Sequence, residues 1–261
     1  LMDDYLAKTE LEYTLNDSDI LSCDGLLTIE ECTETIKKMK KNKSPGNDGL
    51  PVEFYQTFWE DIKYVVTNAL NDAFITGEMS STQKRAIITL IYKKGDPELL
   101  KNWRPISLLN TDYKISTFVI ANRLQGVLAK LISTDQTGYI RGRFIGSNIR
   151  LIEDIFEYTN RYNEQGAVLF CDFEKAFDRL EIPFVIKTLQ KFNFGPGLQK
   201  WISTFYNNID ACIKCNNWIT SSLKVKRGIR QGCPVSALLF ILVVEIMALN
   251  IRTNESIKGI K

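Results

Sequence analysis

The sequence contains no histidine, and this absence removes several kinds of chemistry. Histidine is the most common general base and zinc ligand of proteins, and it is the usual partner of a nucleophilic serine or cysteine. Any catalysis by this chain must therefore use carboxylates, lysines, tyrosines or a bound metal ion.

An excess of charge is also missing, since 33 basic residues stand against 31 acidic ones. The net charge of +2 does not by itself indicate a polyanionic partner, so the distribution of the basic residues matters more than their sum. With 44% hydrophobic and 25% charged residues over 261 positions, the composition is that of a globular protein. A chain of this length can bury a large core and form two subdomains.

The chain also has little that indicates a membrane, a zinc site or a disulfide framework. Its longest apolar stretch, 235–251, is interrupted by Glu245 and is shorter than the roughly 20 residues that a membrane span needs, so it predicts a helix buried nearly all round. Cys212 and Cys215 form a single CxxC, which predicts strand residues rather than zinc ligands. Scattered cysteines and a start unlike a signal peptide favour a reduced, intracellular setting without a membrane partner.

The hydrophobic spacing predicts several helices around a few strands, an α+β fold. We expect helices at about 28–44, 52–77, 113–131, 147–159, 184–191 and 198–208, strands within 86–96, 102–110 and 167–173, and a hairpin within 211–232. Residues 1–27 are acidic and weakly patterned and predict a loosely held lead-in. The lysine-rich part, 28–163, and the strand-and-hairpin part, 164–261, are expected to form separate lobes.

The stretch "FCDFEKAFD", 170–178, places Asp172 at the end of an apolar run and Asp178 six positions later. A buried carboxylate is costly, so Asp172 must pair with a basic side chain, cap a helix or bind a cation. The alternative is a solvated turn shared with Glu174 and Lys175. The residues of this stretch leave both interpretations open.

Five blocks occur in a fixed order along the chain: "KSPGNDGLPVEFY" at 43–55, "NWRPISLLN" at 102–110, "DQTGYIRGR" at 135–143, "DFEKAFD" at 172–178 and "RQGCPVSALLF" at 230–240. Together they resemble the reverse transcriptase domain of LINE-type, non-LTR retrotransposons, from about residue 26 to the end. Five ordered blocks are far more specific than any one of them.

The resemblance implies a right-hand polymerase with fingers at 28–163 and an incomplete palm at 164–261, which holds motif A at 170–178 and a motif B-like block at 230–240. The implied function is RNA-directed DNA synthesis, in which dNTPs are added to a primer 3′ hydroxyl with two divalent cations about 4 Å apart. Mg²⁺, or Mn²⁺ in its place, would be held by Asp172 and the backbone carbonyl of Phe173. The implied partners are an RNA template, a DNA primer or nicked target DNA, and dNTPs; protein partners are unknown.

The resemblance also assigns nucleotide-binding residues. Phe177 would lie beneath the sugar and exclude a 2′ hydroxyl, although core packing is the ordinary role of such a ring. Arg104 would hold the triphosphate with its planar fork, and Lys93 and Lys94 are further candidates whose alternative is a solvated loop. Gln231 and Gly232 would let the backbone approach the base pair closely.

A second set of residues is assigned to the template and primer. It comprises Lys43, Ser44, Pro45, Gly46, Arg141, Arg143 and Arg230. Lysines along this segment suit sequence-independent phosphate contacts that weaken with salt. For the lysines that precede Lys43, a solvated helix face explains the pattern equally well.

The sequence departs from the family pattern in two ways. Val235 and Ala237 stand where Leu and Pro are common, which casts little doubt on the resemblance. More seriously, the block with two adjacent aspartates does not occur in order, and the thumb is absent. We therefore expect a fragment that is inactive alone, since one carboxylate cannot hold two such cations.

Two alternatives of other classes stay open. One is an RNA-binding module that has lost catalysis, which the lysine-rich helix and the missing acids favour. The other is a related palm polymerase, either similar to a group II intron maturase or an RNA-dependent RNA polymerase. A location in the nucleus follows only from the family, because target-primed elements act on chromosomal DNA.

Overall fold

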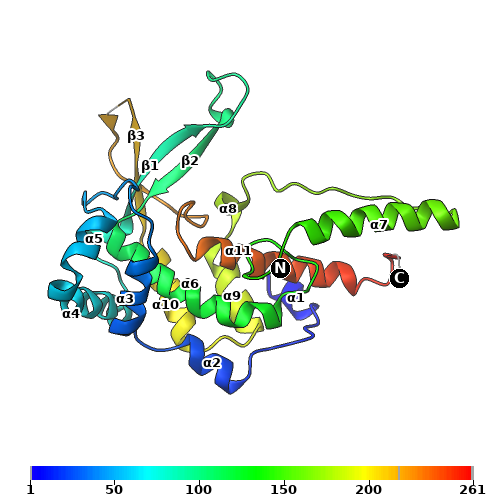
Figure 1. Cartoon of the computed structure of the whole chain (residues 1–261), viewed down its shortest axis with the longest axis horizontal. Coiled ribbons are helices and arrows are strands. Elements are labelled where there is room, and N and C mark those ends of the chain that lie inside the picture. Colours follow the sequence, from blue (N-terminus) through cyan, green and yellow to red (C-terminus); the bar gives the residue numbers. More distant parts are fainter. Residues whose placement is uncertain (1, 217, 260–261) are drawn as a thin grey trace.

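The structure is a computed structural model that describes residues 2–216 and 218–259 (Figure 1). Its helices are α1 (Met2–Ala7), α2 (Asp17–Cys23), α3 (Ile29–Lys38), α4 (Val52–Thr76), α5 (Ser81–Lys84), α6 (Thr111–Leu131), α7 (Gly146–Tyr162), α8 (Ala176–Arg179), α9 (Ile182–Lys191), α10 (Pro196–Tyr206) and α11 (Ser236–Arg252), with a 3₁₀ turn at Leu100–Asn102. Its strands are β1 (Arg85–Tyr92), β2 (Trp103–Leu108), β3 (Asp210–Cys215), β4 (Trp218–Ile219) and β5 (Leu223–Lys224). The fold is α+β, as the sequence predicts.

Helix α6 is the centre of the core and contacts α2, α3, α4, α10 and α11. It is buried on most sides, with Tyr113, Ile120 and Leu124 fully excluded from solvent. The Tyr113 ring lies 5.6 Å from the ring of Phe205 on α10. A helix surrounded in this way gains its stability from apolar burial, at about 25 cal/mol per Å², and not from an amphipathic pattern.

The sheet joins the two halves of the chain. β1 pairs antiparallel with β2, so that Tyr92 faces Trp103, and parallel with β3, so that Arg85 faces Asp210. β4 and β5 both pair with β3. Because β1 and β2 precede residue 163 and β3 follows it, the two expected lobes share one sheet, and the prediction of separate lobes on either side of residue 163 is wrong.

Residues 2–27 are not a loosely held lead-in, which corrects the expectation from the sequence. They form α1 and α2 and bury Leu6, Leu15, Cys23 and Leu27, each no more than 6% exposed. The Asp24 carboxylate accepts hydrogen bonds from the first backbone N–H groups of α10, including Leu198 N at 2.8 Å. The apolar residues are spaced too irregularly for the sequence to indicate this, since they fill gaps between helices that come later in the chain.

Arg123 on α6 fastens this segment to the core. Its Nε and Nη2 donate to the two carboxylate oxygens of Glu31 at 2.7 Å each, and the same guanidinium donates to the backbone carbonyls of residues 23–26. Glu31 also closes the capping box that begins α3 with Thr28. Burial alone would raise the pKa of Glu31, but the hydrogen bonds from Arg123 and Thr28 outweigh it and lower the pKa from 4.5.

The loop before α4 packs against the start of α6 through Gly46. A Cβ at Gly46 would overlap the side-chain oxygen and the backbone nitrogen of Asn110, the residue that precedes α6. Asn110 in turn donates to Thr82 O at 3.2 Å and accepts a hydrogen bond from Asp48 N at 3.4 Å. Only glycine allows the two backbones to approach this closely.

The stretch 164–173 is extended and exposed, which corrects the prediction of a buried strand. Leu169 is 84% and Phe170 is 75% exposed. Among the described residues no strand pairs with this stretch, and Leu169 and Phe170 therefore lie outside any sheet. In Figure 1 it returns along α7, a helix that projects from the body and buries none of its side chains.

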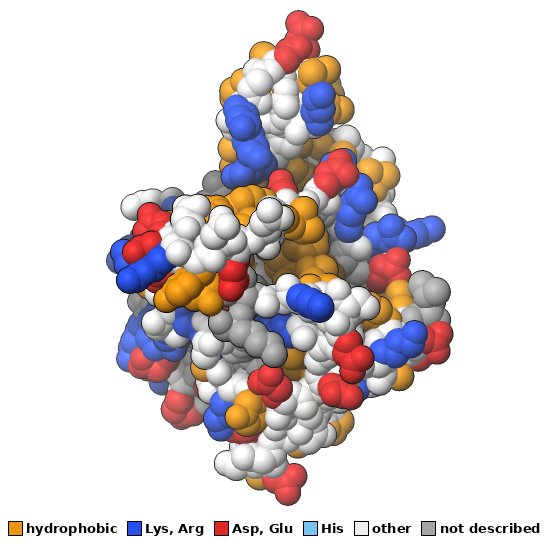
Figure 2. Space-filling view, turned by 90° about the vertical axis from the view of Figure 1, so that its right-hand side faces the viewer, with side chains coloured by type: hydrophobic (Ala, Val, Ile, Leu, Met, Phe, Trp, Pro, Cys, Tyr) orange, Lys and Arg blue, Asp and Glu red, His pale blue; other side chains and the backbone are white. Residues whose placement is uncertain are grey.

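Helix α11 is also less buried than expected. One face, with Leu239, Leu242 and Ile246, lies in the core, while Phe240 and Val243 on the other face are only partly covered. Figure 2 looks onto the side where α7 and α11 project and shows hydrophobic side chains gathered in a hollow. No helix within the described ranges is long and apolar enough to cross a membrane.

We expect Arg123→Ala to lower the free energy of unfolding by about 3 kcal/mol, because it removes the only charged partner of Glu31 among the described contacts and a donor to several backbone carbonyls. The loss should be present above pH 4.5 and should shrink as the pH falls through the lowered pKa of Glu31, since protonation removes the charge that Arg123 stabilises. Urea unfolding of both proteins at several pH values measures this difference. Lys130→Ala, which breaks the more exposed pair with Asp19, is the control and should cost less than 1 kcal/mol.

We expect Gly46→Ala to destabilise the protein by about 2 kcal/mol or more, because the added methyl group meets backbone and cannot be relieved by a rotamer change. The matched control is Gly126→Ala on the exposed side of α6, where an added Cβ meets no atom within 4 Å. That variant should be about 0.5–1 kcal/mol more stable, because alanine is the better helix former. Thermal unfolding of both variants measures the two changes in stability. Equal changes in the free energy of unfolding would contradict the close approach at Gly46.

Candidate nucleotide and template site

The two motifs of the second half meet where α8 packs against the loop 228–232. Ile229 N donates to Phe177 O at 2.8 Å, and Gly228 N donates to Leu180 O at 2.8 Å. Gly228 adopts φ +91°, and a Cβ there would lie 2.9 Å from the Cα of Asp178. The loop must therefore carry glycine at this point for the backbones to fit, and motif A and motif B are held in a fixed relative position.

Gln231 links this unit to the edge of the sheet. Its Nε2 donates to Asp178 Oδ1 at 3.0 Å, and its carbonyl accepts from Ser107 N on β2 at 2.9 Å. Gly232, at φ +109°, brings its backbone so close to β2 that a Cβ would lie 3.0 Å from Ser107 O. Gly232, which the resemblance assigned to a close approach to the base pair, thus approaches the protein backbone of β2 closely.

The ring of Phe177 packs against an aromatic residue of α11. It lies 5.4 Å from the ring of Phe240 on α11, and the ring of Phe173 meets the same Phe240 edge-on at 5.8 Å. Phe177 is half-buried, so one part of it packs on the core and another part reaches the surface. This arrangement allows both roles that the sequence left open, packing and contact with a ligand.

Arg104 and the two loop lysines lie on the hairpin of β1 and β2. Arg104 faces Ile91 across the strands and is exposed, on the same face of β2 as Ile106. Lys93 and Lys94 follow β1 and are exposed, and Lys93 N donates to Asn102 O at 2.9 Å. Gln231 is bonded to the same strand, β2. The hairpin that carries Arg104, Lys93 and Lys94 is therefore attached to the motif B loop.

Asp172 is exposed and lies in the extended stretch before α8, so the expectation of a buried carboxylate is wrong. Within residues 2–216 and 218–259, no three Asp, Glu or Cys side chains lie close enough together to hold a metal ion. Mg²⁺ takes near-octahedral oxygen coordination and Mn²⁺ is similar in this respect. The described residues therefore do not by themselves fit either ion, and Asp172 and the Phe173 carbonyl could supply only part of a site.

Two of the arginines assigned to template and primer are used inside the protein. Arg230 is 6% exposed, its guanidinium lies 4.9 Å from the Tyr113 ring centroid, and it donates to Lys84 O. Arg143 donates to the backbone carbonyls of Ala129, Ile132, Ser133 and Gln136, which end α6 and begin the next loop. Direct contact of Arg230 with nucleic acid is incompatible with its burial. The guanidinium of Arg143 already donates its hydrogen bonds to backbone carbonyls of the protein.

The other residues assigned to the template are more accessible. Lys43 and Ser44 are exposed, Pro45 is half-buried, and Gly46 is buried against Asn110. Arg141 is exposed and donates to Asn122 Oδ1 at 3.3 Å. The structure thus separates the set into a surface group and an internal group, which the sequence pattern could not distinguish.

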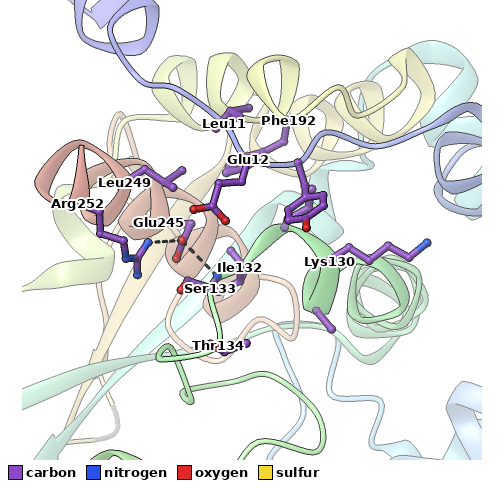
Figure 3. A pocket seen from close by; sticks show the side chains of 13 residues that line it. Leu11, Glu12, Lys130, Ile132, Ser133, Thr134, Phe192, Glu245, Leu249 and Arg252 are labelled. Carbon is purple, nitrogen blue, oxygen red and sulfur yellow. Dashed lines mark hydrogen bonds and ion pairs between the residues drawn. The ribbon is translucent and has the colours of Figure 1, made fainter. Parts of the chain in front are cut away.

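Glu245, which interrupts the apolar stretch of α11, is satisfied inside a small cavity (Figure 3). It is 2% exposed and accepts hydrogen bonds from Arg252 Nη1 at 2.9 Å and from Ser133 N at 3.3 Å. Arg252 Nη2 also bonds both oxygens of Asp135, at 2.9 and 3.0 Å. Although burial pushes the pKa of Asp135 up, its bonds to Ser133 and Arg252 lower it from 3.8. This network fastens the loop after α6 to α11.

Sequence reasoning gave no role to Asp178, Arg123 or Asn110, which the structure shows to be central contacts. Asp178 carried one signal, its position directly after Phe177 in the motif. The contacts of Arg123 and Asn110 join residues from 28 to 100 positions apart in the chain, so no local pattern indicates them.

Comparison with known proteins identifies the family of this chain. The family model described as "Reverse transcriptase (RNA-dependent DNA polymerase)" matches residues 91–259. The Transposon TX1 uncharacterized 149 kDa protein of Xenopus laevis is 42% identical over 219 residues, which are 84% of this chain and 17% of that protein.

Two further relatives are more distant. The Pol polyprotein from the type-1 retrotransposable element R2 of Popillia japonica is 25% identical over 88% of this chain and 31% of that protein. The RNA-directed DNA polymerase from mobile element jockey of Drosophila melanogaster is 23% identical over 88% of this chain and 25% of that protein. The chain thus spans between 17% and 31% of the length of these three relatives.

Among solved structures, a chain of a partial Cas6-RT-Cas1–Cas2 complex aligns with 93% of this chain and 36% of its own length, at 16% identity and a TM-score of 0.46. The assignment does not rest on this weak similarity. The family model covers more than half of the chain, and four of the five ordered blocks lie within the matched range. The relatives named above come from a transposon, from the retrotransposable element R2 and from the mobile element jockey. The chain therefore belongs to the reverse transcriptase (RNA-dependent DNA polymerase) family.

Proposed function

We propose that this chain is the fingers and the first part of the palm of an RNA-directed DNA polymerase, which adds dNTPs to a primer 3′ hydroxyl. Family membership implies nucleic-acid substrates. The proposed template is RNA, and the proposed primer is a DNA strand or nicked target DNA, which would place the protein in the nucleus. The relatives, among them an RNA-directed DNA polymerase from a mobile element, support this proposal.

The observation that carries the proposal is the meeting of three family blocks at Gln231. Its side chain bonds Asp178 of motif A, its carbonyl bonds Ser107 of β2, and its own backbone belongs to motif B. β2 also carries Arg104, so the residues proposed to hold the sugar, the base pair and the triphosphate belong to one connected unit. Such connection is what positioning of a nucleotide requires.

Mg²⁺, with Mn²⁺ as a substitute, is the proposed cofactor, and Asp172 with the Phe173 carbonyl is its proposed share of the ligands. Further carboxylates are needed, because the described residues offer no cluster of three. Bound metal would supply charge neutralisation at the triphosphate. The exposure of Asp172 is compatible with this role, since an exposed carboxylate pays no burial cost while it lacks a partner.

The rival proposal is an RNA-binding module without catalysis, which the exposed cations Lys43, Lys93, Lys94 and Arg104 would also serve. It predicts RNA binding that weakens with salt and is indifferent to Mg²⁺ and dNTPs. A related polymerase that makes RNA is distinguished by its choice of sugar.

We expect residues 1–261 alone to give no sustained primer extension, because no described acids complete the site around Asp172. A longer protein, in which the chain is continued by its own downstream coding sequence, should extend a DNA primer on an RNA template in Mg²⁺ and stop when EDTA is added. In that protein Asp172→Asn should lower kcat by about a thousandfold or more. Glu174→Gln, which alters an exposed acid paired with Arg179, is the matched control and should retain activity. Robust extension by residues 1–261 would contradict the proposal that this chain is incomplete.

We expect Phe177→Ala, in the longer protein, to increase ribonucleotide incorporation relative to dNTPs by about tenfold, because the ring that excludes the 2′ hydroxyl is lost. Phe173→Ala is the control, since it also removes a ring that packs against Phe240. It should change kcat/KM for the dNTP and for the rNTP by the same factor. The ratio of kcat/KM for a dNTP and its rNTP is the measurement. An unchanged ratio would show that Phe177 serves only in packing. It would favour a polymerase that does not select the sugar through this residue.

A further inference from the structure

The acid that follows the proposed sugar contact has the geometry of a positioning group. Asp178 lies on the single turn α8, is half-buried, and accepts a hydrogen bond from Gln231 Nε2 at 3.0 Å. The resemblance to the family assigns a role to Asp172 of the same motif and none to Asp178. The bond crosses 53 positions of sequence and joins motif A to motif B.

The backbone position of Asp178 is set by contacts on both sides. Asp178 N donates to Lys175 O at 2.9 Å, and the neighbouring carbonyl of Phe177 accepts from Ile229 N at 2.8 Å. Gly228 approaches the Cα of Asp178 so closely that no side chain fits between them. The backbone that carries the Asp178 carboxylate is therefore held in a fixed position relative to the loop that carries Gln231, and the side-chain hydrogen bond joins the two.

The chemistry of the pair fixes which end of the Gln231 amide faces Asp178. An ionised carboxylate only accepts hydrogen bonds, so the NH₂ group must turn towards it and the carbonyl oxygen Oε1 must turn away. Oε1 accepts no hydrogen bond from the residues that the structure describes. Without Asp178, a terminal amide would rotate and present donor and acceptor about equally.

We propose that Asp178 orients the Gln231 amide so that Oε1 is presented as an acceptor to a hydrogen-bond donor of the bound nucleotide. Asp178 does not touch the nucleotide and acts through Gln231 alone. The inference rests on the proposed function, because it requires that Gln231 contacts the nucleotide. It adds the residue that decides the polarity of that contact.

The test uses the longer, active protein and measures kcat and KM for one dNTP in primer extension. Gln231→Ala establishes the contact itself and should raise the KM by about tenfold, the worth of one good hydrogen bond. Asp178→Ala should raise the KM almost as much, while Asp178→Asn, which can accept or donate, should raise it less. In the Gln231→Ala background, Asp178→Ala should add nothing further, because its effect passes through Gln231.

A matched control separates positioning from folding. Glu181→Gln removes another acid that joins the same two segments, through the ion pair with Arg227 at 3.0 Å, but it does not touch Gln231. It should leave the KM unchanged, and thermal unfolding of each variant reports any loss of structure.

Each result decides between the alternatives. If Gln231→Ala leaves the KM unchanged, the proposed function of Gln231 fails and the inference fails with it. If Gln231→Ala raises the KM but Asp178→Ala does not, or if the two effects multiply in the double variant, the positioning role is wrong while the nucleotide site stands.

Discussion

The close approach of loop 228–232 to α8 and β2 is the constraint on which the candidate site depends. Gly228 and Gly232 both have positive φ and both face backbone rather than side chains. Their missing Cβ atoms let Ile229 and Gln231 form backbone hydrogen bonds to two other elements at once. These contacts join the segments of Phe177, Gln231 and Arg104 directly, so that the three residues belong to one arrangement.

Arginine is used in two different ways in this protein. Arg123, Arg143 and Arg230 direct their planar forks to backbone carbonyls inside the protein, and Arg123 and Arg230 thereby join segments far apart in sequence. Arg104 and Arg141 remain exposed, with the lysines at 93 and 94 beside Arg104 on the hairpin. The near-neutral net charge therefore hides a distribution in which part of the positive charge is structural and part is available to a polyanion.

The side of the molecule where α7 and α11 project shows apolar surface that the described residues do not cover. Helix α7 buries none of its side chains, the stretch before α8 exposes Leu169 and Phe170, and α11 covers only one of its faces. The rest of the molecule differs, because α3, α4 and α6 pack with α2, α10 and one face of α11 into a continuous core. The same contrast applies to the site, where the contacts around Gln231 are complete and the ligands around Asp172 are not.

The sequence by itself determined the elements and the family. Helical and alternating spacing predicted β1, β2, α4, α6, α9 and α10 close to their observed bounds, because these periods are local, and five ordered blocks identified the reverse transcriptase family. It could not predict that residues 2–27 are fastened by Arg123, that one sheet joins both halves, or that Arg230 is buried under Tyr113. Those features depend on contacts between distant residues, and only the tertiary structure decided which basic side chains reach the surface and which acid, Asp178, faces Gln231.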